Sequence, residues 1–216
     1  LLDVNNFDSM KWKRVETFEL TGMPAVTRFE FKTENERGVN VDHVRIENNK
    51  NLLDVTIHKY SLKSLTIANN ANLKAINFYE LAQVQHISVK ENPKVTIINA
   101  ASLRFISGDS TLASLPMLPS LSFPLLRFVE GKLELTNLTR TESLDLRSVK
   151  NIEMLMLHSL GLSEISLPSL GTVGHLEIDS NSASEAKFPS LYRAQTLKLL
   201  SPLSLFYTPK LVTVGD

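Results

Sequence analysis

The 216-residue chain has no cysteine, a single tryptophan and only eight glycines. The lack of cysteine excludes disulfides, thiolate metal sites and cysteine nucleophiles, and it disfavours a secreted origin. None of the glycines falls in a G-x-G-x-x-G or Walker-type cluster, and no serine sits in a G-x-S-x-G elbow. The sequence therefore lacks the common motifs of nucleotide binding and of serine or thiol catalysis.

An excess of charge of one sign is also lacking, because 23 basic residues balance 23 acidic ones. Nucleic acids and anionic membranes attract proteins through a concentrated positive surface, so neither is expected as a partner. No apolar run approaches the roughly 20 residues of a membrane span, so we expect no transmembrane segment here. With 43% hydrophobic residues, the chain is long enough for one extended core.

What the sequence does contain is a repeat. An apolar-x-apolar triplet returns nine times, at intervals of 21 to 26 residues. The triplets begin at Phe18, Val44, Leu65, Ile87, Ser110, Leu133, Leu155, Leu176 and Leu197. Ser110 is the weakest match and is placed by the similarity of its surroundings to those of Leu133. Repetition at this period predicts that residues 1–216 form a single solenoid.

Apolar residues alternate in two short stretches of each unit, as in Leu65–Ile67 and Ile76–Phe78, and β-branched and aromatic residues are frequent there. Alternation and this composition favour strands over helices. The sequence thus predicts an all-β parallel solenoid of about nine coils, with almost no helix. Residues 1–17 are expected to cap its first coil, with Trp12 as a lid, and the polar run 32–38 to form a loop.

Asparagine recurs at an equivalent turn, at Asn49, Asn70, Asn92 and Asn181. Turn asparagines bond to the backbone through their amide groups. We therefore predict a structural ladder of stacked amides rather than a ligand site.

The midpoints of the nine triplets are predicted to point outward. Single substitutions at outward positions should leave the protein folded, so outward charged residues are free to serve recognition. The candidates chosen for binding are Arg45, Glu134, Glu177 and Lys198. Truncation of the inward residues, such as Leu65, Ile87, Leu176 or Leu197, should cost about 2 to 5 kcal/mol. The binding face is thus expected on the outward side of the main sheet.

No catalytic or metal-binding cluster is predicted. The five histidines, which we expect to be solvated, are not expected to converge on a metal, and we expect no cofactor. Glu134 and Glu177 are predicted to lie two coils apart with Met156 between them, a marginal spacing for paired-carboxylate glycoside chemistry. A polysaccharide-active β-helix enzyme is thus a lesser alternative. The column Thr66, Ser88 and Thr111 is too short for an ice-binding array.

One segment resembles a known family. Residues 167–178, L-P-S-L-G-T-V-G-H-L-E-I, resemble the L-P-x-L-x-x-V-x-G-x-L-x-I block of receptor L-domains, particularly those of fungal cell-wall and spore-wall glycoproteins with lipid anchors. Partial copies begin at Phe123, Phe188 and Thr208. Gly174 comes one residue earlier than in the family pattern, and the family's capping cysteines are missing. The resemblance implies a right-handed β-helical fold and no catalysis.

The resemblance also implies a function. It predicts a non-enzymatic cell-surface or cell-wall module that binds a protein or wall polysaccharide or organises the wall. Asn137-Leu138-Thr139 is the only N-glycosylation sequon, and we expect it at an exposed corner. The absence of cysteine favours the alternative of an intracellular scaffold. Leu1 and the partial coil at 212–216 predict that the chain is an excerpt of a longer protein.

Overall fold

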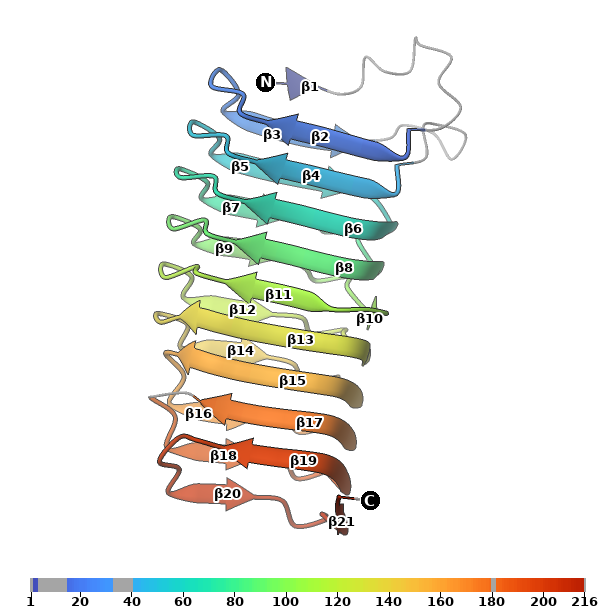
Figure 1. Ribbon diagram of the computed structural model, residues 1–216, viewed down its shortest axis with the longest axis vertical. Coiled ribbons are helices and arrows are strands. Elements are labelled where there is room, and N and C mark those ends of the chain that lie inside the picture. The colour runs from blue at the N-terminus through green and yellow to red at the C-terminus, as the bar shows by residue number, and fades with distance from the viewer. Residues whose placement is uncertain (1, 4–14, 33–40, 180–181, 216) are drawn as a thin grey trace.

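The computed structural model describes residues 2–3, 15–32, 41–179 and 182–215. Within these ranges the chain forms strands and turns and no helix, and every strand pairing is parallel. About nine coils stack into a rod with the first at one end and the last at the other (Figure 1). The front strands run leftward and the rear strands rightward as the chain descends, so the solenoid is right-handed (Figure 1). The predicted fold class is confirmed.

One long sheet of 11 strands runs along the whole rod. Its strands are β2 (Thr17–Thr21), β4 (His43–Glu47), β6 (Ser61–Ala68), β8 (Gln83–Lys90), β10 (Phe105–Ile106), β11 (Ser110–Ala113), β13 (Phe128–Leu138), β15 (Asn151–Leu160), β17 (Thr172–Asp179), β19 (Arg193–Leu199) and β21 (Thr213–Val214).

The opposite side carries three shorter sheets in succession. The first contains β1 (Leu2–Asp3), β3 (Arg28–Lys32), β5 (Asp54–His58), β7 (Ala75–Asn77) and β9 (Ile97–Asn99). The second pairs β12 (Ser120–Ser122) with β14 (Ser143–Asp145), and the third contains β16 (Glu164–Ser166), β18 (Glu185–Lys187) and β20 (Leu205–Tyr207). The long sheet is therefore the one continuous surface among the described residues.

The predicted register of the long sheet is confirmed. Val44 pairs with Leu65, Leu65 with Ile87, and Ser110 with Leu133. Ser110 is buried in a column of otherwise apolar side chains. Its hydroxyl oxygen accepts a hydrogen bond from the Ile87 N–H at 3.0 Å, so the buried polar group has a partner. The similarity of its sequence surroundings to those of Leu133 thus places even this weak repeat correctly.

Two assignments of inward residues need correction. Apolar spacing in the sequence aligns Leu62 with Leu81 in one inward column, but in the sheet Leu62 pairs with Val84 and so belongs to the neighbouring inward column. Leu197 was expected to be as buried as Leu65, but it is only half-buried because it lies near the open C-terminal end, where few residues cover it. Truncation of Leu197 should therefore cost less than truncation of Leu65.

The predicted asparagine ladder exists in three adjacent coils. Asn49, Asn70 and Asn92 are fully buried. The Oδ1 atom of Asn70 accepts the backbone N–H of Asn49 at 3.0 Å, and Asn92 does the same for Asn70. Each Nδ2 group donates to a backbone carbonyl of the preceding coil, that of Leu20, Ile46 or Ile67. The ladder closes the corner by pairing backbone groups that are shielded from water.

Two stacked glycines interrupt the regularity of the long sheet. The pairing of β13 with β15 shifts by one residue between Val129 and Lys132. A Cβ at Gly131 would lie 2.5 Å from the carbonyl carbon of Gly108, so no larger residue fits there without a backbone shift. The two neighbouring coils that contain Gly108 and Gly131 therefore each have one residue more at this point than β8 before them and β15 after them, which makes a bulge where the strands bend.

Some expectations concern residues outside the described ranges. These are Trp12 and most of the predicted cap 1–17, most of the predicted loop 32–38, and Asn181 of the ladder. Among the described residues, no helix is long and apolar enough to cross a membrane.

Candidate functional site

The outward column of the long sheet contains the four predicted binding residues. The register joins Glu19 to Arg45 and Thr66, and it joins Glu134 to Met156, Glu177 and Lys198. Arg45 and Lys198 are exposed, with 53% and 50% of their side chains accessible, whereas Glu134 has 24%. The outward orientation is confirmed, and the binding role stays a prediction.

These side chains are not free of one another, however. Nε of Arg45 lies 2.9 Å from a carboxylate oxygen of Glu47, and Nζ of Lys132 lies 2.8 Å from one of Glu134. Both contacts join residues two positions apart on one strand, whose side chains share a face of the sheet. The outward face therefore presents paired charges rather than isolated ones.

Glu177 is the most enclosed of the four, with only 12% of its side chain accessible. Nζ of Lys198 lies 2.9 Å from its Oε1 atom, and Nε2 of His175 lies 3.3 Å from its Oε2 atom. Nε2 of His158, which is buried and makes no hydrogen bond within the described structure, lies 3.4 Å from Oε1. Three side chains therefore surround the Glu177 carboxylate, and its role in recognition stays a prediction.

This surrounding charge sets the ionisation of Glu177. A hydrogen bond from Lys198 is the largest influence, and with a hydrogen bond from His175 and the charge of Lys198 it holds the Glu177 pKa below its ordinary value of 4.5. Partial burial opposes the shift, because it disfavours the charged form. Glu177 is thus ionised at neutral pH.

The histidines differ in part from the prediction. His158 and His175 were expected to be solvated, but both contact Glu177. His175 lies two residues before Glu177 on β17, and His158 reaches it diagonally from β15. His58 contacts Glu30 at 3.3 Å and Glu80 at 3.1 Å. Long side chains reach diagonal neighbours that strand register alone keeps separate. No group of three possible ligands in the described residues has metal-binding geometry.

Asn137 lies where the sequence predicted, at a corner near the end of β13. It is exposed, as is Thr139 of the sequon, and its backbone φ is 54°. Asparagine tolerates this left-handed conformation better than most residues. The sequon is therefore accessible to modification.

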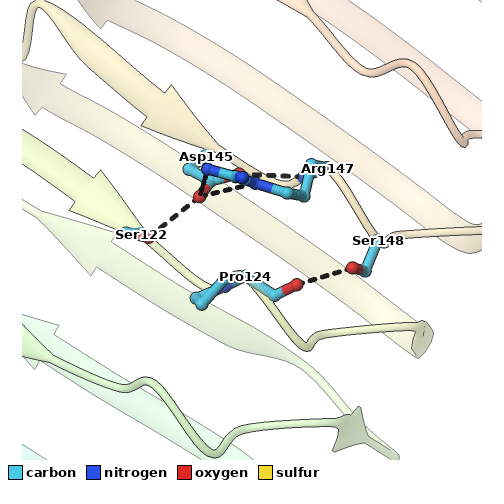
Figure 2. Close-up of polar contacts among 5 residues, drawn as sticks. All are labelled: Ser122, Pro124, Asp145, Arg147 and Ser148. Atoms are coloured by element: carbon cyan, nitrogen blue, oxygen red, sulfur yellow. Dashed lines mark hydrogen bonds and ion pairs between the residues drawn. The ribbon is translucent and has the colours of Figure 1, made fainter.

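Sequence reasoning missed a polar cluster on the side opposite the long sheet, at strands β12 and β14. The guanidinium of Arg147 donates to both carboxylate oxygens of Asp145 at 2.7 to 3.1 Å, and the Ser122 hydroxyl donates to Oδ2 at 3.2 Å (Figure 2). The hydrogen bond from Arg147 is the main reason that the Asp145 pKa is lowered. The Ser148 hydroxyl donates to the carbonyl of Pro124 at 2.6 Å (Figure 2). These contacts tie neighbouring coils together.

Sequence reasoning also missed a groove. Two hollows, of about 370 and 470 Å³, lie beside the bend of the long sheet. Both are lined by two outward columns, one that contains Phe105 and Phe128 and one that contains Ser107 and Glu130. The hollows meet where Phe105 pairs with Phe128. Polar residues of the two columns line the hollows: Gln83, Gln85, Glu130, Asn151, Glu153, Arg193 and Gln195. The sequence contains these columns, but hollowing depends on the bend of the strands.

Comparison with known proteins adds no assignment to this geometry, because no family model, curated protein or solved structure matches the chain.

Proposed function

We propose that the chain is a non-enzymatic module of a cell surface or cell wall, and that it binds a protein or wall polysaccharide through the outward face of the long sheet. The observation that carries this proposal is the continuity of that sheet. It spans every coil, whereas the opposite side is divided into three sheets. A rigid, extended, polar surface suits recognition of an extended partner.

The resemblance of residues 167–178 to receptor L-domains supports the same proposal. Leu167 and Leu170 are buried at a corner, and Val173, Leu176 and Ile178 are buried along β17. The residues of the resembling block thus form a repeat unit of a solenoid, the fold that the resemblance implies.

The chemistry of the paired glutamates favours binding over glycoside cleavage. A general acid of a glycosidase needs a raised pKa, whereas the pKa of Glu177 is lowered. Glu134 forms an ion pair with Lys132, with Nζ of Lys132 2.8 Å from a carboxylate oxygen. Glu177 therefore lacks the surroundings that would keep a general acid protonated at neutral pH.

The intracellular scaffold remains the alternative, and the absence of cysteine favours it. Glycosylation separates the two. Expression of the full-length protein through a eukaryotic secretory pathway should add a glycan at the exposed Asn137, and Asn137→Gln should abolish the resulting mass shift. A full-length protein that resides in the cytosol favours the scaffold.

The binding face is tested by reversing charges that are not enclosed. Arg45→Glu together with Glu134→Lys keeps the net charge and should leave the melting temperature almost unchanged, because both side chains reach solvent. It should weaken retention of the partner from surface or wall extracts. The matched control, Lys74→Glu with Glu142→Lys, alters exposed residues away from this face and should retain the partner. Equal retention by both variants removes the outward column from the proposal.

A further inference from the structure

A column of cations lies at the corner that leads into the groove. The backbone N–H of Arg127 donates to the carbonyl of Arg104, and that of Lys150 to the carbonyl of Arg127, both at 2.9 Å. The three residues therefore occupy the same position in adjacent coils, at intervals of about 4.8 Å, the separation of hydrogen-bonded strands. We call Arg104, Arg127 and Lys150 the basic corner.

The basic corner has no charge partner within the described structure. All three side chains are exposed. The ion pairs of the described residues involve other cations, such as Lys63 with Asp42 and Arg147 with Asp145. Three like charges in a row repel one another, so an anion with several charged groups along its length would relieve that repulsion.

Aromatic rings lie beside this corner. Phe105 and Phe128 directly follow Arg104 and Arg127 in the chain and pair in adjacent strands. Each lines one of the two hollows of the groove, and Phe128 is 38% exposed. At the C-terminal side of the corner, Tyr192 is 52% exposed and its ring lies 3.1 Å from where a Cβ of Gly171 would be. Gly171 occupies the corner position that follows Lys150, since its N–H donates to the Lys150 carbonyl at 2.8 Å. The cations thus adjoin apolar, flat surfaces.

The opposite side of the groove carries hydrogen-bonding groups of another kind. Glu130, Glu153 and Gln195 line it, whereas Asn151 lies in the column of Phe128. Carboxylates accept hydrogen bonds from hydroxyl groups, and amides both donate and accept. The same carboxylates would repel a densely charged chain such as a nucleic acid, which also demands more phosphate contacts than three cations supply.

From this arrangement we infer that the basic corner and the adjoining groove bind an acidic polysaccharide, a chain of sugars that bears anionic groups at intervals. Its acidic groups pair with Arg104, Arg127 and Lys150, its sugar rings pack on Phe105 and Phe128, and its hydroxyls bond to the polar side of the groove. This site is separate from the outward column of the proposed function, and it adds a defined ligand chemistry to the same non-enzymatic role.

The test is calorimetric titration with three hexasaccharides: oligogalacturonate, a chondroitin sulfate fragment and neutral cello-oligosaccharide. We expect one or both acidic chains to bind. The neutral chain should bind at least about tenfold more weakly, because it cannot make the charge-assisted contacts with the basic corner. Binding should weaken between about 50 and about 200 mM salt. The preferred acidic chain distinguishes carboxylate from sulfate recognition.

A charge-matched pair of variants tests the site. Arg104→Gln, Arg127→Gln and Lys150→Gln together should reduce the affinity about 10- to 100-fold. The control, Lys50→Gln with Lys74→Gln and Lys210→Gln, removes the same charge from exposed positions elsewhere and should reduce it less than about threefold. Phe128→Ser should weaken binding at unchanged net charge. Melting curves establish that each variant is folded.

Several outcomes overturn the inference. These are no binding of either acidic chain, equal losses in the two triple variants, and equal affinity for duplex DNA of the same charge. The face variant Arg45→Glu with Glu134→Lys should bind the acidic chain as the parent does. Failure of that variant to retain its partner therefore bears on the proposed function alone, and failure of the basic-corner variant bears on this site alone.

Discussion

The corner that follows each strand of the long sheet is closed in two different ways along the rod. In three N-terminal coils it holds Asn49, Asn70 and Asn92, and in the next three it holds Leu115, Leu138 and Leu160. All six are buried, and each follows a residue with a positive φ of 53° to 58°. The backbone turn is the same, with Leu52 N–H donating to Asn49 and Leu118 N–H to Leu115.

This comparison shows that one backbone corner accepts either stacked amides or packed leucines. The amides pair buried backbone groups, whereas the leucines contribute apolar burial. Asn49 and Asn70 also donate from Nδ2 to the Oδ1 atom of the asparagine in the next coil, at 3.1 and 3.2 Å, a contact that a leucine neighbour cannot make. Substitutions that mix the two chemistries should therefore be the most damaging.

The largest effect is expected for Leu138→Asn. It loses the burial of leucine and places an amide between Leu115 and Leu160, neither of which offers a side-chain partner, so the cost should be about 4 to 6 kcal/mol. Leu115→Asn adjoins Asn92 and extends the existing ladder. It should cost at least about 1 kcal/mol less, as measured by denaturant unfolding. Equal costs would show that the ladder makes no difference to the neighbouring corner.

Asn70→Ala tests the ladder from within. It leaves the N–H of Asn49 and the carbonyl of Ile46 without their partner, so unfolding free energy should fall by about 2 to 4 kcal/mol. The control, Asn72→Ala, removes an exposed hydrogen bond to the Lys50 carbonyl and should cost less than about 1 kcal/mol. Similar losses in the two variants would contradict the role assigned to burial.

A pH dependence should distinguish the two halves, because the amide ladder does not titrate and the Glu177 cluster does. Since the folded pKa of Glu177 is lowered, its contribution is present above pH 4.5 and is lost as pH falls through the folded pKa. Glu177→Gln should therefore be less stable than the parent at neutral pH. Melting temperatures of the two proteins should converge below pH 4.5, and a constant difference would disprove the assignment.

The smallest effects are expected at the residues of positive φ. Ser159→Gly, in a leucine coil, relieves a left-handed conformation that serine adopts with strain, and it should stabilise the fold by up to about 1 kcal/mol. Asn48→Gly, in an asparagine coil, should change stability by less than about 0.5 kcal/mol, because asparagine already tolerates this conformation. Thermal unfolding of both variants measures the difference. Destabilisation by Ser159→Gly would contradict it.

Much of the fold was predictable because strand alternation has a period of two, so one misplaced residue would turn a whole face outward. Ser110 was placed instead by the similarity of its surroundings to those of Leu133, and the pairing of the two residues confirms that placement. The misplacement of Leu62 arose where spacing between columns changes, and the half-buried Leu197 reflects its position at an end rather than its sequence.

The candidate sites were less predictable. Outward orientation followed from the register, but the contacts of Glu177 depend on side chains that cross from neighbouring strands. The basic corner did have a sequence signature, since Leu103-Arg104-Phe105 returns as Leu126-Arg127-Phe128 after 23 residues. The balance of 23 basic and 23 acidic residues gave no sign of this local cluster of cations, because a net charge does not describe how charges are distributed on the surface.

The most direct test of the central claim, that this solenoid is a surface module, is antibody labelling of the natural full-length protein on intact and permeabilised cells. The account predicts that an antibody raised against residues 41–179 labels intact cells, and that protease treatment of those cells removes the label. Labelling that appears only after permeabilisation would contradict the claim and favour the intracellular scaffold.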